Sequence, residues 1–485
     1  MKRTVIIIFL LQIVWFGLSA QDQYDALLIT REINSGTARF IGLGGAFGSL
    51  GGDMSVAGIN PAGLAIYRSP VLTITPGVFN NTSTSTFSEF NNLKNDDFEY
   101  RMTLDNIGYI WAKSNKSGSL AGSAFGFGYN KLNDFNQRII IGPVNSENTS
   151  LADYYTNRLN DTENTFSDFE LDYYVYPFLD AGIVVDRGSE YANDFRDAEY
   201  GQTMEKSITR YGNKGEYFIS YAANFSDILY VGGTFGIQKF TFNENTNHLE
   251  RDIDNRSDTI NSINFREYYE IEGSGVNFKF GMIFRPVDFL RLGAAFHSPT
   301  KYSLTSNYFT IASAAFDQVS GYSNTSVYSP EAEFDYEVLT PYKAIFSLGF
   351  ILDKYGLISI DYEWVDYTKM KLQADGESYS DINSEINDDF VSTSNIKAGA
   401  EIRLGTISLR GGYAFYGDPY SSVNENSGQD ISVFSGGLGI NSKNYFIDFG
   451  LVSYELNEKH NLYYDYSSKI NSRLTKFLVT LGFRF

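Results

Sequence analysis

The chain has 485 residues, no cysteine, and 58 acidic against 38 basic side chains, which give a formal net charge of −20 at pH 7. The absence of cysteine excludes disulfide scaffolds, thiolate catalysis and cysteine-based zinc sites, and this negative charge argues against a nucleic-acid-binding surface. The abundance of Tyr, Phe and Gly with only 10 Pro favours extended segments over helices. His248, His297 and His460 are far apart in the sequence, so we expect no metal site and no other cofactor.

The first twenty residues have the order of a secretory signal peptide. Two basic residues precede an apolar run from Val5 to Leu18, which ends at Ser19 and Ala20. A transmembrane helix needs about 20 apolar residues, whereas this run is shorter and contains Gln12. We therefore predict a cleaved signal peptide at residues 1–20 rather than a retained membrane anchor. No later run is long and apolar enough to cross a bilayer as a helix, so a mature chain that enters a membrane must do so as a closed barrel.

A glycine-rich segment follows and leads into the sequence Asn60-Pro61-Ala62-Gly63. Its first glycines begin a G-x-G-x-x-G pattern, but position 47 is Phe and no Gly-Lys-Ser/Thr follows, so we predict no nucleotide-binding loop. Small residues let one backbone pack closely against another, and an Asn-Pro pair adds a turn. We expect residues 21–70 to form a compact plug inside a barrel. The candidate plug residues are Gly42, Gly44, Gly45, Asn60, Pro61 and Ala62.

Residues 71–485 are a series of segments that each have one apolar and one polar face. In residues 396–404 every even position is apolar, while the odd positions include Lys397, Glu401 and Arg403. Such a strand presents one face to an apolar phase and the other to a polar interior. Fourteen strands are expected, at residues 71–79, 105–113, 120–131, 214–225, 228–241, 263–285, 289–300, 331–352, 356–367, 394–404, 406–416, 430–440, 444–455 and 472–485.

The connections between these strands alternate between short and long. Tight turns such as 286–288 and 353–355 alternate with polar loops such as 301–330 and 370–393, an arrangement typical of outer-membrane barrels. The last strand ends on Phe485, and a terminal aromatic of this kind resembles the signal read by the barrel assembly machinery. A soluble β-sandwich or propeller also alternates but does not explain the turn asymmetry. We predict an all-β fold: a fourteen-stranded antiparallel transmembrane β-barrel, plugged from its N-terminus and surrounded by outer-membrane lipid.

The connection at residues 132–213 is the longest and is strongly acidic. Ser150-Leu151-Ala152-Asp153 predicts a helix start, and the following residues form an apolar stripe. We expect an extracellular cap here. Its aromatic groups either capture an apolar ligand or form the small core of the cap itself, and the sequence leaves both open. The candidate external ligand patch is Tyr154, Tyr155, Tyr174, Tyr176 and Phe178.

Residues 35–76 resemble the hatch of a known family. The run Gly-Thr-Ala-Arg, the core Gly-Leu-Gly-Gly-Ala-Phe and the later Asn60-Pro61-Ala62-Gly63 are similar to the N-terminal hatch of FadL-type outer-membrane transporters of long-chain fatty acids and aromatic hydrocarbons. The resemblance implies a fourteen-stranded barrel whose hatch shifts when substrate binds, and a lateral opening at a kink in the third strand. Gly122, Gly126 and Gly128 are the candidate kink residues.

Two further functions compete with transport of a hydrophobic small molecule. Asp361 and Glu363 share one strand face and resemble a catalytic carboxylate pair, but a lumen of mixed charge explains them more simply, so we expect no enzyme. Related plugged barrels resemble shuttle components of a protein-secretion system, which is the alternative we retain. We expect passive uptake by external capture, plug movement and lateral diffusion into the membrane.

Overall fold

The computed structural model describes residues 22–33, 35–87, 92–115, 118–161, 166–257, 259–317, 321–376, 378–424, 426–463 and 466–485. The predicted signal peptide lies outside these residues. In the described part of the chain, no helix combines the length and the apolarity needed to cross a bilayer.

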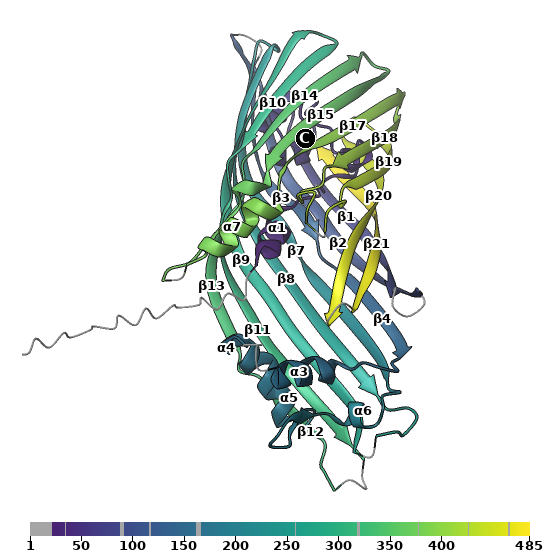
Figure 1. Cartoon of the computed structure of the whole chain (residues 1–485). Coiled ribbons are helices and arrows are strands. Elements are labelled where there is room, and N and C mark those ends of the chain that lie inside the picture. Colours follow the sequence, from purple (N-terminus) through teal and green to yellow (C-terminus); the bar gives the residue numbers. More distant parts are fainter. Residues whose placement is uncertain are drawn as a thin grey trace, which may run out of the picture.

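Antiparallel strands close into a barrel of fourteen staves within the described residues, because the last strand pairs with the first from Val71–Arg484 to Phe87–Ser468. This confirms the predicted fold class (Figure 1). The staves are β1 (Val71–Phe87), β2 (Leu93–Ser114), β3 (Leu120–Asp134), β7 (Thr203–Phe225), β8 (Leu229–Arg251), β9 (Ile260–Val287), β10 (Leu290–His297), β14 (Lys343–Leu352), β15 (Gly356–Asp366), β17 (Ser392–Leu404), β18 (Ile407–Tyr416), β19 (Ile431–Asn441), β20 (Tyr445–Tyr463) and β21 (Tyr466–Arg484).

Several staves are longer than the sequence predicts, and three predicted loops contain strands. The segment 301–330 holds β11 (Lys301–Phe316) and β12 (Thr325–Tyr328), and the predicted strand 331–352 is split into β13 (Ala332–Leu339) and β14. The segment 370–393 holds β16 (Lys371–Gln373) and α7 (Ser380–Asp389). The loop prediction was wrong because the outward side chains of the first half of β11, from Lys301 to Asn307, are polar, whereas its inward ones, such as Tyr302 and Leu304, are buried.

The outward face of the barrel carries a belt of large apolar side chains, which we call the apolar belt. Phe280 and Ile219 expose 60% and 54% of their surface. On the long strands the belt ends at the cross-strand row Tyr217–Ile237–Val276, and the next outward row contains Lys239 and Ser274. The tight turns lie at the opposite end of the barrel, as the turn pattern predicts.

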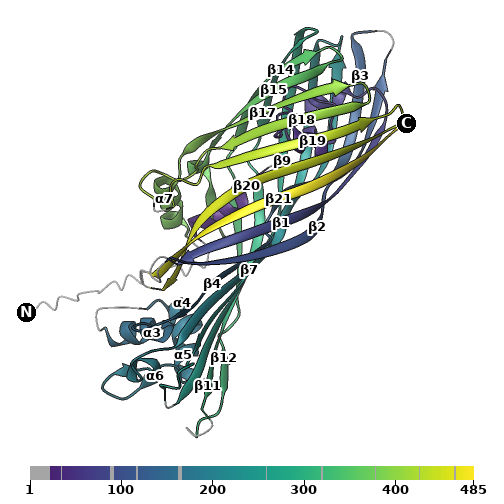
Figure 2. The same ribbon diagram turned by 90° about the vertical axis from the view of Figure 1, so that its right-hand side faces the viewer.

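Beyond that row β7, β8 and β9 continue as an open sheet on one side of the barrel (Figure 2). The strands β4 (Gln137–Asn145), β11, β12 and β13 join this sheet. We call this sheet the extension. Its inner face is covered by the cap, which comprises α3 (Leu151–Asn160), α4 (Asp168–Glu170), the π-helical turn η3 (Leu171–Val175), α5 (Tyr176–Asp180), β5 (Val185–Asp186), β6 (Tyr191–Ala192) and α6 (Asp194–Asp197). The predicted loop 132–213 is thus partly strand, since β4 and the first half of β7 belong to the extension.

The N-terminal segment lies in the barrel lumen. Its elements are α1 (Gln23–Thr30), α2 (Ala38–Gly42) and the 3₁₀ helices η1 (Met54–Gly58) and η2 (Pro61–Ile66). Phe40, Phe47 and Leu64 are buried in one hydrophobic cluster with lumen-facing wall residues such as Ile110 and Leu478. The lumen is therefore filled by this segment rather than open.

Candidate functional site

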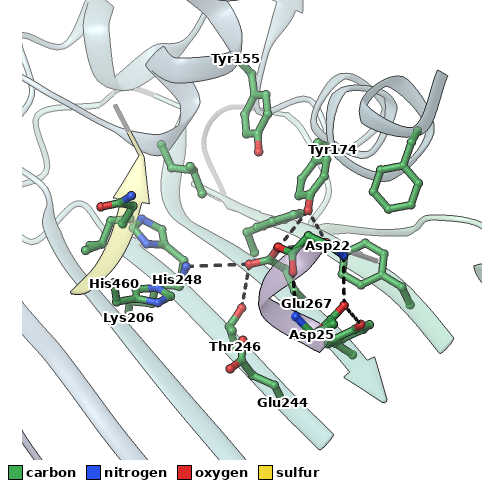
Figure 3. A pocket seen from close by; sticks show the side chains of 17 residues that line it. Asp22, Asp25, Tyr155, Tyr174, Lys206, Glu244, Thr246, His248, Glu267 and His460 are labelled. Carbon is green, nitrogen blue, oxygen red and sulfur yellow. Dashed lines mark hydrogen bonds and ion pairs between the residues drawn. The ribbon is translucent and has the colours of Figure 1, made fainter. Parts of the chain in front are cut away.

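An upper cavity of about 450 Å³ lies between the cap, the extension and α1 (Figure 3). One side is aromatic and includes Tyr155, Phe169 and Phe265. The other side carries charged groups from the inner face of the extension, among them Lys206 and Glu267. The cavity thus offers an apolar surface next to a set of ionisable groups.

Glu267 is the centre of the polar side of the upper cavity. Its Oε1 lies 3.0 Å from the hydroxyl of Tyr308 and 3.4 Å from that of Tyr174, and its Oε2 accepts a 2.8 Å hydrogen bond from Thr246. Lys206 lies 3.9 Å from the same carboxylate. Burial raises the pKa of both tyrosines, and the nearby carboxylate adds to this, so both phenols remain protonated donors at pH 7.

A lower cavity of about 410 Å³ continues beside α1 into the barrel. It shares Asp22, Asp25, Glu244 and Tyr269 with the upper cavity. Its walls are largely apolar and include Leu27, Leu28, Phe135, Phe242, Ile431, Leu456 and Leu474. The shared residues show that the two cavities adjoin.

A narrow gap of about 20 Å³ follows the lower cavity, and Ile33 and Tyr454 line both. A separate cavity of about 310 Å³ lies toward the tight-turn end and is lined by charged groups. There Glu401 accepts hydrogen bonds from Arg39 at 3.1 Å and Arg410 at 2.7 Å. Residues of α2 and its flanks line both spaces, with Ile41 on the gap side and Arg39 on the other. The route through the lumen is therefore interrupted at α2.

Asn60 ties the N-terminal segment to the wall. Its Nδ2 donates to the carbonyl of Gly48 at 2.6 Å and to that of Met282 on β9 at 3.1 Å. Its Oδ1 accepts from the amide of Ala62 at 3.2 Å and so caps η2, which Pro61 begins. All three residues of the predicted plug motif are buried.

The glycines of the segment sit where backbone touches backbone. A methyl group on Gly42 would lie 3.2 Å from the Cα of Gly437 in β19. Gly44 has φ +64° and lies against the backbone of Tyr413, where a side chain would clash at 2.9 Å. Gly45 also adopts a left-handed φ, of +75°, a conformation that glycine adopts readily.

The third stave contains the three predicted kink glycines. Gly126 and Gly128 lie within a ladder that is regular on both sides, and a register shift lies next to Gly122. The β2–β3 ladder stops at Asn106–Asn130, while β2 continues alone beside β1 to Leu93. A second register shift, at Lys131–Asn133, lies just beyond this point. The β2–β3 ladder thus ends two residues beyond Gly128, and the glycines themselves lie in its paired part.

A seam between β2 and the β3–β4 region follows from this divergence. Arg138 of β4 reaches across it to Asp97 of β2, with 3.3 Å between Nε and the carboxylate. On the lumen side, Gln137 donates to Ser472 of β21 at 2.7 Å. Polar contacts, rather than a continuous ladder, therefore close the wall here.

The predicted external patch is divided by the structure. Tyr155 and Tyr174 line the upper cavity, and Phe178 packs on Tyr155 with ring centroids 4.5 Å apart but is itself fully buried in the cap. Tyr154 contacts Arg158, whereas Tyr176 points to the surface and is 48% exposed. Phe485 is 71% exposed at the end of the last stave, with its ring near that of Tyr109.

Sequence reasoning missed α1 and the groups it brings to the cavities. Asp22 caps this helix and forms a capping box with Asp25, and both side chains line the junction of the two cavities. The pattern Asp-x-x-Asp before an apolar run is a readable helix start. Burial, reinforced by the neighbouring Asp22, raises the pKa of Asp25 well above its ordinary value.

No family model and no curated protein matches the chain. Among solved structures, a FadL homologue from Pseudomonas aeruginosa aligns with a TM-score of 0.55 and 12% identity over 94% of this chain and 100% of that one. The toluene transporter TodX from P. putida aligns with a TM-score of 0.53 and 11% identity over 93% and 99%. The Ralstonia pickettii toluene transporter TbuX aligns with a TM-score of 0.51 and 13% identity over 93% and 99%. The chain has the FadL-type fold.

Proposed function

We propose that this protein is an outer-membrane channel for passive uptake of hydrophobic small molecules. The observation that carries the proposal is the pair of adjoining cavities that runs from the cap into the barrel and ends at α2. Structures of the same fold carry the names of toluene transporters, which supports this class of ligand. The apolar belt supports a position in a bilayer, because a protein surrounded by water would carry polar side chains at these exposed positions.

The ligand class follows from the lining of the lower cavity. Aliphatic and phenyl groups form most of this wall, and burial of an apolar ligand there gains about 25 cal/mol per Å² of apolar surface. Arg210 does not offer a free charge, because Glu244 and Glu458 lie 2.5 and 2.8 Å from its guanidinium. The cavity therefore suits an uncharged or weakly polar body.

We propose that residues 35–66 act as a movable hatch. Asn60 would hold one part of it to the wall, while the backbone contacts of Gly42 and Gly44 let α2 lie against β18 and β19 with no side chain between them. The seam between β2 and β3 supports a lateral exit toward lipid, because few polar contacts close it. Phe485 would serve as the assembly signal.

A disulfide lock of the hatch tests this proposal. The hydroxyls of Ser49 in the hatch and Ser359 in β15 lie 3.4 Å apart, and the chain has no native cysteine. The variant Ser49→Cys/Ser359→Cys, oxidised and reconstituted in liposomes, should take up toluene much more slowly than wild type. Reduction of the disulfide should restore the rate.

A matched lock elsewhere controls for the cross-link itself. The hydroxyls of Ser313 in β11 and Ser326 in β12 lie 2.9 Å apart in the extension. Oxidised Ser313→Cys/Ser326→Cys should retain wild-type uptake. Equal uptake by the hatch lock in its oxidised and reduced forms would rule out hatch movement, and wild-type rates no faster than those of empty liposomes would rule out transport. Co-purification of a secreted protein would instead favour the shuttle function.

A further inference from the structure

The outward face of the extension is polar, although it continues the face that forms the apolar belt. One cross-strand row contains Thr209, Asn245, Tyr268 and Phe309 on β7, β8, β9 and β11. The next row from the belt contains Ser207, Asn247, Arg266 and Ile311. Four neighbouring strands thus present hydroxyl, amide and guanidinium groups on one flat surface, which we call the amide face.

Several polar atoms of the amide face are enclosed but lack a hydrogen-bond partner. Among the described residues these are Oδ1 of Asn247, Oδ1 of Asn264 and Nε of Arg266. No described carboxylate lies within ion-pair distance of Arg266. Buried polar groups in native proteins normally have partners, so the side chains of Asn247, Asn264 and Arg266 keep unused hydrogen-bonding capacity that is open to another molecule once they turn outward.

A polar outward face on the other side of the barrel, on β1, β20 and β21, also has an enclosed amide without a partner, Oδ1 of Asn80. There Asn471 of β21 donates to Oδ1 of Asn457 at 2.8 Å. On the amide face, by contrast, the amides stand beside an aromatic pair, since the rings of Tyr268 and Phe309 stack at 4.5 Å with an interplanar angle of 10°. Amides beside a flat ring are the groups that bind sugars, because hydroxyls pair with amides and the C–H side of a pyranose packs on an aromatic ring.

We propose that the amide face binds the core saccharide of the lipopolysaccharide that surrounds the barrel. This rests on the proposed outer-membrane location, in which the row beyond Val276 enters the sugar layer directly outside the lipid. Glu270 and Glu272 lie between the belt and the Tyr268 row, and their charge disfavours the phosphates nearest the lipid. Neutral core sugars farther out fit the amides, and Arg266 suits an acidic sugar at the outer edge.

The test uses the purified full-length protein in detergent and a soluble probe, the core oligosaccharide released from lipopolysaccharide by deacylation. Calorimetric titration should show saturable binding to wild type. The variant Asn245→Ala/Tyr268→Ala should bind roughly tenfold more weakly, because it loses a stacking surface and a hydrogen-bonding group. Asn471→Ala, the matched control on the opposite side, should bind as wild type does.

Three results would overturn the proposal: no binding by wild type, equal affinity of the double variant, or cross-linking of two barrels through this face. Heat-modified migration on gels confirms that each variant is folded. Toluene uptake in liposomes that lack lipopolysaccharide is a separate readout. Retained toluene uptake without saccharide binding would rule out this inference alone. Intact saccharide binding without toluene uptake would rule out only the proposed transport.

Discussion

The apolar belt and the extension share three strands but have opposite outward faces. Along β8 the outward side chains are Phe235 and Ile237 in the belt, and Asn243, Asn245 and Asn247 ten residues later. The β8–β9 ladder continues through this change with no register shift. The β8–β9 ladder therefore carries no mark of the boundary, and along it only the polarity of the outward side chains shows where contact with lipid ends.

The inner faces differ as well. In the belt the lumen side holds buried ion pairs such as Lys279–Glu216, whereas in the extension the cap packs on Phe265, Ile263 and Met204. The barrel half is thus apolar outside and of mixed polarity within, with buried ion pairs beside the hydrophobic cluster of the N-terminal segment, while the extension is polar outside and apolar on its inner face, as a soluble sheet is. The same strands thus face lipid in the belt and water in the extension.

The largest expected difference between the belt and the extension is the cost of the same charge placed on each side of their boundary. Phe235→Lys should destabilise the barrel by roughly 2 kcal/mol, because lysine costs about 2–4 kcal/mol at the bilayer midplane and less toward the interface, and Phe235 lies one outward position inside the edge of the belt. Asn245→Lys, on the same face of the same strand, should change stability by less than about 0.5 kcal/mol. Reversible denaturant titration in lipid vesicles measures both, and equal costs would contradict the boundary.

A smaller effect is expected where the cap joins the extension. Glu250 of β8 is fully buried, and its carboxylate accepts hydrogen bonds from the amide of Leu151 at 2.7 Å and the hydroxyl of Ser150 at 2.5 Å, at the start of α3. Glu250→Gln removes the charge that the N-terminus of α3 favours and should weaken this helix locally by roughly 1–2 kcal/mol. Hydrogen exchange should quicken in α3 and stay unchanged in β15. Faster exchange throughout the barrel would show that the two regions unfold together.

The smallest expected effect is a dependence of the stability of the cap on pH. Although burial acts in the opposite direction, the hydrogen bond from Arg158 lowers the pKa of Glu170, which lies 2.7 Å from it in the cap. The folded pKa is below the unfolded one, so this stabilisation is present above about pH 4.3 and is lost as the pH falls further. Solvent screening limits it to under about 1 kcal/mol. Limited proteolysis should cut the cap faster at pH 3.5 than at pH 7, and Glu170→Gln should reduce that difference.

Alternation and turn spacing were enough to predict the barrel, since each stave in the belt has one apolar and one polar face. They failed for β11, because in the extension the outward residues are polar and resemble a loop once lipid is no longer the outer solvent. They also missed the outer halves of β7 and β8 for the same reason. The prediction at 263–285 did include most of the outer half of β9, where buried residues such as Ile263, Phe265 and Ile271 alternate with outward ones.

The candidate site was less accessible to sequence reasoning than the fold. The plug motif around Asn60 is local, and its residues do lie together in the lumen. The cavities instead combine Asp25, Glu267 and Tyr454, which are hundreds of residues apart and meet only through barrel closure. The seam likewise depends on where the β2–β3 ladder stops, and no residue type in the sequence predicts that point.

Because the extension rises on one side of the barrel, the rim of the barrel is asymmetric. The sheet of β7, β8, β9 and β11 stands on one side of the rim, and among the described residues the tip of β20, at His460 and Leu462, bounds the upper cavity on the opposite side. For the proposed uptake, a ligand would thus reach the cavity from the side of β20 and meet a wall of β-sheet on the other side.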